Sequence, residues 1–108
     1  MKNRDNPLYI SKACPKSFWN EYRIYNDRIE LKSWLLLRTF LITYNDLVTI
    51  NVYEPPVIKT RLWALKLDCA DLNQHVGIER KSGWFKHLRF TPRNPQEFVL
   101  EVKKYSNL

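Results

Sequence analysis

Four side chains in this 108-residue chain could serve as soft metal ligands, or as a nucleophile and its base: Cys14, Cys69, His75 and His87. None of them stands in a C-x-x-C, H-x-x-H or H-E-x-x-H arrangement, the spacings that place two donors on one zinc ion. A cysteine close to a histidine could form a nucleophilic dyad, yet no glycine-rich elbow or oxyanion loop accompanies either cysteine. We therefore expect no metal and no catalytic residue, and we expect both thiols to be reduced.

Other enzymatic chemistry has as little support in the sequence. Asp68 and Asp71 share one polar stretch, where carboxylates are usually solvated loop residues rather than a general acid and base. The chain has only 2 glycines, which argues against a glycine-rich loop that cradles phosphate groups. We expect no cofactor, no small-molecule substrate and no enzymatic activity.

The charge balance favours a binding role. Lys and Arg number 18 against 11 Asp and Glu, a formal net charge of +7. Such a chain can bind nucleic acid, an anionic lipid surface or an acidic protein, and the charge alone does not choose among them.

Cations and aromatic rings alternate near the last predicted hairpin, which makes this region a candidate binding surface. Aromatic rings between cations suit stacking on bases or contact with a headgroup layer, whereas the ordinary alternative is a solvated strand face with the rings folded onto the core. The candidate residues are Arg80, Lys81, Trp84, Phe85, Lys86, Arg89 and Arg93. A secondary candidate surface comprises Lys59, Arg61, Trp63 and Lys66.

A third candidate surface is apolar. Trp34, Leu35 and Leu36 follow a predicted hairpin directly, and an exposed apolar rim at that place would mark a subunit contact.

Alternating apolar and polar residues predict strands over most of the chain. Asn26-Asp27 predicts a tight turn between strands around Tyr22–Ile24 and Arg28–Lys32, since both residues tolerate turn conformations. Further strands are expected at 37–43, 47–53, 75–81 and 84–91, and the run 47–53 has Val48, Ile50 and Val52 on one face. Residues 57–73 fit a helix or a strand equally well.

One helix is expected, at the C-terminus. Asn94 is a candidate N-cap, Pro95 occupies the first helical position, and Glu97 is the acid of a capping box. An apolar stripe follows at helical spacing, formed by Phe98, Val99, Val102 and Tyr105.

The length fits one domain, which we place at residues 18–108, after a loosely ordered lead-in at residues 1–17. The start of the chain is polar, and no apolar run approaches the ~20 residues of a spanning helix. We expect a cytoplasmic protein, with a weak contact with an anionic membrane surface left open.

Two stretches resemble the bacterial pleckstrin-homology-like (PH-like) domain family and together cover about three-quarters of the chain. One is Tyr22–Asp46, followed by Leu47-Val48-Thr49, with its hairpin and the element Ile42-Thr43-Tyr44-Asn45-Asp46-Leu47. The other combines residues 75–81 with residues 88–99, whose Thr91-Pro92-Arg93-Asn94-Pro95 resembles the start of the family's closing helix.

The resemblance implies a mainly β fold, a PH-like barrel or sandwich of about seven strands capped by one amphipathic C-terminal α-helix. It implies a binding or assembly module and brings no catalytic residue. The first hairpin loop, Asn26-Asp27, is too short for the basic signature of lipid-binding PH domains, so phosphoinositide binding at that site is not expected. We therefore expect a non-enzymatic module for protein–protein contact or self-association, with a small basic nucleic-acid-binding β-barrel as the alternative.

Overall fold

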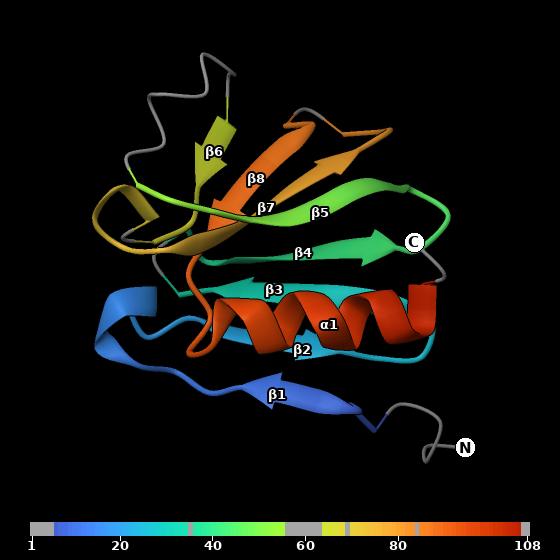
Figure 1. Ribbon diagram of the computed structural model, residues 1–108, viewed down its shortest axis with the longest axis horizontal. Helices are drawn as coiled ribbons and strands as arrows, with labels where there is room; N and C mark the ends of the chain where they lie inside the picture. The colour runs from blue at the N-terminus through green and yellow to red at the C-terminus, as the bar shows by residue number, and fades with distance from the viewer. Residues whose placement is uncertain (1–5, 35, 56–63, 69, 84, 107–108) are drawn as a thin grey trace.

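The computed structural model describes residues 6–34, 36–55, 64–68, 70–83 and 85–106, and these residues form two β-sheets and one C-terminal helix (Figure 1). Within them, the first sheet has the order β1-β2-β3-β4 and the second the order β5-β7-β8-β6; the sheets do not close into a barrel. The fold is thus mainly β with a closing helix, as the sequence predicts. The eight strands compare with an expected count of about seven.

All neighbours in the first sheet are antiparallel. Its strands are β1 (Tyr9–Ser11), β2 (Glu21–Ile24), β3 (Arg28–Ser33) and β4 (Arg38–Thr43), and the short 3-10 helix η2 (Pro15–Ser17) lies between the first two. The predicted turn at Asn26-Asp27 is confirmed, because the amide of Tyr25 donates to the carbonyl of Arg28 across it at 2.8 Å.

The second sheet holds β5 (Leu47–Tyr53), β6 (Ala64–Lys66), β7 (His75–Arg80) and β8 (His87–Phe90). β7 pairs antiparallel with both β5 and β8, whereas β6 runs parallel to β8. The segment that the sequence left open between helix and strand therefore contains a strand at 64–66, and the 3-10 helix η4 (Ala70–Leu72) follows; residues 56–63 lie outside the described residues.

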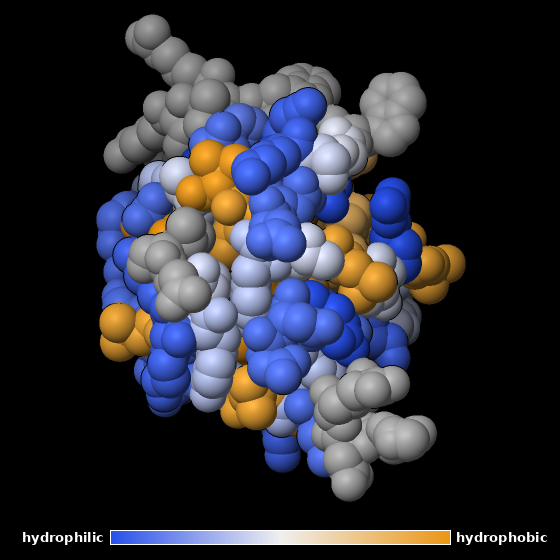
Figure 2. All heavy atoms as spheres, turned by 90° about the vertical axis from the view of Figure 1, so that its right-hand side faces the viewer, coloured by the Kyte–Doolittle hydropathy of each residue, from blue (hydrophilic) through white to orange (hydrophobic). Residues whose placement is uncertain are grey.

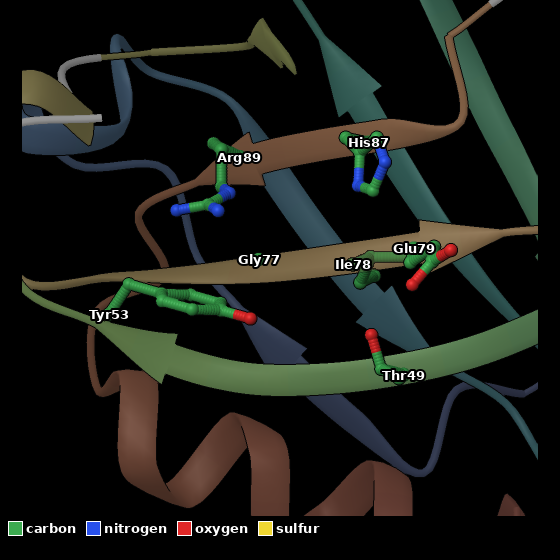
Figure 3. Close-up of a pocket in the computed structure, with 7 residues that line it drawn as sticks. All are labelled: Thr49, Tyr53, Gly77, Ile78, Glu79, His87 and Arg89. Carbon is green, nitrogen blue, oxygen red and sulfur yellow. The ribbon is translucent and has the colours of Figure 1, made fainter. Parts of the chain in front are cut away.

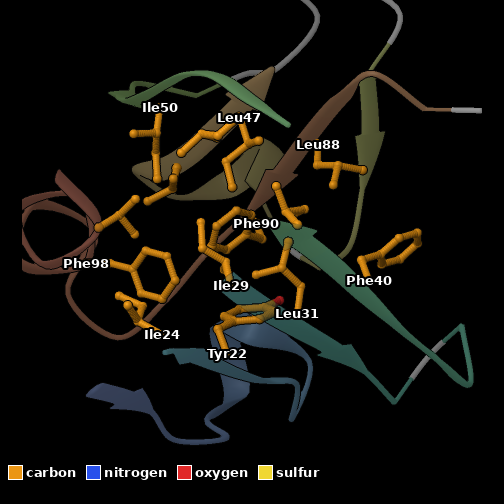
Figure 4. Packing of buried hydrophobic residues seen from close by; sticks show 14 of the residues in the cluster. Tyr22, Ile24, Ile29, Leu31, Phe40, Leu47, Ile50, Leu88, Phe90 and Phe98 are labelled. Atoms are coloured by element: carbon orange, nitrogen blue, oxygen red, sulfur yellow. The ribbon is translucent and has the colours of Figure 1, made fainter. Parts of the chain in front are cut away.

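The core lies between the sheets and beneath the helix (Figure 4). Three aromatic side chains link its layers: the ring centroids of Tyr22 and Phe90 are 4.8 Å apart, and those of Phe90 and Phe98 are 5.3 Å apart, both edge to face. Such pairs add about 1 kcal/mol each beyond the area that they bury.

One predicted strand face is wrong at a single residue. Ile50 is buried and Val52 packs against the core, but Val48 is exposed. The β5–β7 register shifts between Leu47 and Thr49, so Leu47 turns inward in place of Val48. A bulge of this kind breaks the two-residue period on which the prediction rests.

The helix α1 (Pro95–Ser106) begins as predicted, with the Asn94 side chain accepting a hydrogen bond from the Glu97 amide at 3.1 Å. The Glu97 carboxylate has a different partner from the one that a capping box predicts, because it accepts a hydrogen bond from the Tyr9 hydroxyl at 2.7 Å. Phe98, Val99 and Val102 are buried, which confirms the apolar stripe.

The described part of the N-terminal segment, residues 6–17, differs from a loose lead-in. β1 pairs with β2, and the Arg93 amide donates to the buried Ser11 hydroxyl at 2.8 Å. The Arg93 guanidinium donates to the carbonyls of Lys12 and Ala13 at 3.2 and 2.9 Å. Long-range contacts of this kind leave no pattern in the local sequence.

Candidate functional site

Two tryptophans from different loops line one pocket at the end of the first sheet. Its volume is about 210 Å³, and it is lined by Ala13, Trp19, Glu21, Lys32 and Trp34. The loop after η2 meets the β3–β4 turn here, at the left of Figure 1. We call this site the tryptophan pocket.

Asn20 holds the two loops together. Its side chain is buried; its oxygen accepts a hydrogen bond from the Trp34 amide at 2.7 Å, and its nitrogen donates to the Leu67 carbonyl at 2.8 Å. Since a buried amide side chain without partners is costly, these bonds fix the place where each tryptophan leaves the sheet.

The backbone beside the pocket is unusual. Phe18, Trp19 and Leu37 have positive φ angles of 57°, 63° and 53°. For residues with a Cβ this left-handed region costs about 1–3 kcal/mol each. Folding thus tolerates strain in two adjacent loops whose side chains point outward.

The apolar side chains around the tryptophan pocket are largely exposed to solvent. Trp19 is 59% exposed, Trp34 65% and Leu37 84%, with Phe18 and Leu36 also exposed. Single exposed apolar side chains are ordinary, but a group of them around a pocket is typical of an interaction site.

The described residues that line the pocket carry one charge of each sign. Glu21 on β2 stands opposite Lys32 on β3 in the sheet register, and both line the pocket. The Glu21 carboxylate also accepts a hydrogen bond from Arg23. The lining therefore offers no excess of positive charge that would select a phosphate group.

The apolar candidate surface from the sequence lies here in part. Trp34 and Leu36 are exposed beside the pocket, whereas Leu35 lies outside the described residues. Trp19 and Leu37 are exposed here without a signal in the sequence, since no local pattern shows that their backbones turn left-handed and direct them outward.

The basic candidate surface is less exposed than its composition suggests. Arg80 is 9% exposed, and its Nε donates to the Phe85 carbonyl at 2.8 Å, while burial lowers the pKa of its guanidinium. Arg89 is only 2% exposed. Phe85 packs against the core, and Trp84 lies outside the described residues.

The remaining predicted cations lie apart. Lys81 and Lys86 are exposed next to the β7–β8 connection, and Arg93 is exposed but bonded to the N-terminal segment. Of the secondary surface, Lys66 is exposed on β6, and Lys59, Arg61 and Trp63 lie outside the described residues. The structure thus brings together only part of either basic surface.

Figure 2 shows the end of the molecule opposite to the tryptophan pocket. Hydrophilic side chains there divide the apolar ones into small patches. This distribution makes the tryptophan pocket the better candidate for an apolar contact.

Among the described residues, no three or more His, Cys, Asp and Glu side chains gather into a group that could hold a metal ion. Cys14 is a free, buried thiol. In the same part of the chain, no helix has the length and apolar character needed to cross a membrane.

Comparison with known proteins gives no relative from which a role could be carried over. The chain matched no protein-family model, no curated protein and no solved structure.

Proposed function

We propose that the protein is a non-enzymatic PH-like assembly module that associates with a second copy of itself through the tryptophan pocket. The observation that carries the proposal is the pair Trp19 and Trp34, both largely exposed and held on one pocket by the buried Asn20. Ordered, exposed tryptophans are the side chains that most often dominate interface energies.

The PH-like part of the proposal is supported by the order of the elements. A four-stranded antiparallel sheet is followed by a second sheet and then by one amphipathic helix that packs on the core. This order agrees with the fold that the sequence resemblance implies; the short parallel strand β6 is an addition to it.

A second copy is favoured as the partner because the pocket is self-complementary. In a two-fold contact each molecule presents the same surface, so Glu21 of one copy can face Lys32 of the other while the tryptophans pack together. The neutral lining also matters because two chains of net charge +7 repel each other elsewhere.

Light scattering behind a sizing column tests the proposal, with the chain at several concentrations in low and high salt. We expect the mass to rise with concentration toward twice 13.1 kDa, and we expect high salt not to lower it, because the contact is apolar and salt screens the repulsion between the two chains. Replacing both tryptophans (Trp19→Ser, Trp34→Ser) should leave a folded monomer, as checked by circular dichroism.

Leu100→Ser is the matched control, because Leu100 is an exposed apolar residue on α1. A monomer at every concentration would overturn the proposal, as would a dimer that survives the double tryptophan substitution but not the control. A mass increase that requires added nucleic acid and disappears in high salt would support the basic-surface alternative instead.

A further inference from the structure

The outer face of the second sheet has a small polar pocket that the tryptophan pocket does not involve (Figure 3). Its volume is about 40 Å³, and it is lined by Thr49, Tyr53, Gly77, Ile78, Glu79, His87 and Arg89. Since a water molecule needs about 10–15 Å³ by the same measure, the space admits a group of a few heavy atoms.

Arg89 is the unusual member of this lining. It is 2% exposed, and its Cζ lies 4.0 Å from the centre of the Tyr53 ring. Within the described residues, no carboxylate oxygen lies within salt-bridge distance of its guanidinium. Burial lowers the pKa of its guanidinium.

His75 orients Arg89 without neutralising it. One Nη of Arg89 lies 3.1 Å from His75 Nε2, and His75 Nδ1 lies 2.9 Å from the Asn73 carbonyl. An imidazole between an obligate donor and a carbonyl is neutral, with its proton on Nδ1. The guanidinium therefore keeps its full positive charge.

Gly77 makes the space for this arrangement. A Cβ at this position would lie 2.6 Å from Tyr53 Cε2 and 2.7 Å from the Arg89 Nε. Gly77 pairs with Arg89 in the sheet register, so only a residue without a side chain leaves room for the guanidinium between the strand and the Tyr53 ring. The fork of N–H groups is thus held in a fixed place.

The chemistry at the pocket matches a carboxylate group. A planar guanidinium binds a carboxylate through two parallel hydrogen bonds, and a buried pair is stronger than an exposed one. The hydroxyls of Thr49 and Tyr53 supply further donors, and Figure 3 shows the Tyr53 hydroxyl directed along the pocket.

The charge and size of the pocket argue against a phosphate. Among the described residues of the lining, Arg89 is the one arginine or lysine, and Glu79 stands opposite His87 on the neighbouring cross-strand pair. A dianion would meet the Glu79 carboxylate, whereas a single carboxylate can lie at the Arg89 end.

We propose that this pocket binds one carboxylate group, either of a small organic acid or of the C-terminus of a peptide, with Arg89 as the anchoring cation. The ligand supplies the negative charge that the described residues do not bring to Arg89. The site is independent of the proposed self-association.

Titration followed by ¹H–¹⁵N spectra of the whole chain tests the site, with sodium acetate compared against sodium chloride at equal ionic strength. We expect acetate, and not chloride, to shift the Gly77 amide and the Arg89 Nε–H signal in a saturable way. A short peptide and its C-terminal amide, titrated in parallel, distinguish the two sources of the carboxylate.

Arg89→Gln keeps a donor for His75 while removing the charge, and Lys86→Gln removes an exposed charge nearby as the matched control. We expect Arg89→Gln to weaken acetate binding by about tenfold or more and Lys86→Gln to leave it unchanged. Tyr53→Phe keeps the ring against Arg89 and removes one pocket donor, so we expect a smaller loss.

The proposal is overturned if acetate and chloride give the same shifts, or if Arg89→Gln and Lys86→Gln change binding equally. Should Arg89→Gln fail to fold, the wild-type shifts and the Tyr53→Phe variant still decide, because unsaturable shifts spread over the surface lysines would contradict a built site.

Discussion

Asp68 accepts two hydrogen bonds from Thr91, one at 2.6 Å from the backbone amide and one at 2.8 Å from the hydroxyl. The Tyr22 hydroxyl donates to the same carboxylate at 2.5 Å. One side chain thus joins the loop after β6 to the end of β8 and to β2. Burial raises the pKa of Asp68, and the bonds from Tyr22 and Thr91 offset part of that effect.

Asp68→Asn should keep this junction. The amide oxygen can accept from Tyr22 and from the Thr91 amide, while its nitrogen donates to the Thr91 hydroxyl. We expect the free energy of unfolding in urea to fall by about 1 kcal/mol, because the Thr91 hydroxyl proton loses its acceptor while the Tyr22 hydroxyl and the Thr91 amide keep theirs. Asp68→Ala leaves the buried Thr91 amide unpaired and should cost about 2–4 kcal/mol. Equal losses in the two variants would contradict this role.

The same carboxyl predicts a pH dependence. Its folded pKa lies above the unfolded value of about 3.9, so between the two values the folded state holds more protons than the unfolded state. Its contribution to stability therefore falls as pH rises through that window. We expect the stability of the wild type, measured relative to Asp68→Asn, to decrease from about pH 3.5 upward and then level off. A difference that increases with pH would show that the hydrogen bonds outweigh burial.

Arg93 should control the order of the N-terminal segment. Arg93→Ala removes the guanidinium bonds to Lys12 and Ala13 but keeps the amide bond to Ser11. We expect faster hydrogen exchange in residues 9–17 and little change in the core strands, since local opening need not involve global unfolding. Lys86→Ala, which removes an exposed cation elsewhere, should leave exchange in this segment unchanged.

Asn94 should account for a measurable part of the stability of α1. Asn94→Ala removes the cap on the Glu97 amide, and we expect a loss of about 1 kcal/mol in urea unfolding. Asn94→Ser restores a cap acceptor and should recover most of that loss. If both variants match the wild type, the helix start is fixed instead by packing of Phe98 and by the Tyr9–Glu97 bond.

Much of the fold follows from local patterns. The bounds of β5 and the start of α1 are confirmed because alternation, a tight turn and a cap are local signals, although the bulge in β5 turns Val48 outward. β1 and β6 have three residues each, and their pairing depends on partners more than ten residues away in the sequence. Patterns within such short segments carry too little information to predict them.

The sites follow less well from the sequence. Alternation places His87 and Arg89 on the face opposite the core residues Leu88 and Phe90, which agrees with the pocket lining and the buried core. That Arg89 is nevertheless buried depends on Tyr53 from β5 and on the missing side chain at Gly77. Side chains of one strand cover those of its neighbour only in the folded sheet. The residue type of Arg89 therefore could not show whether this arginine is exposed or buried.

A substitution at Gly77 tests how closely the Tyr53 ring packs over β7 and Arg89. Gly77→Ala would place a Cβ 2.6 Å from the Tyr53 ring, so we expect overpacking to cost about 1–3 kcal/mol in urea unfolding. Because two of the three atoms nearest to that Cβ belong to this ring, Tyr53→Ala should remove much of the added cost, and the double variant should be more stable than the sum of the single effects predicts. Additive losses would show that Arg89 or the β7 backbone, rather than the Tyr53 ring, requires glycine at this position.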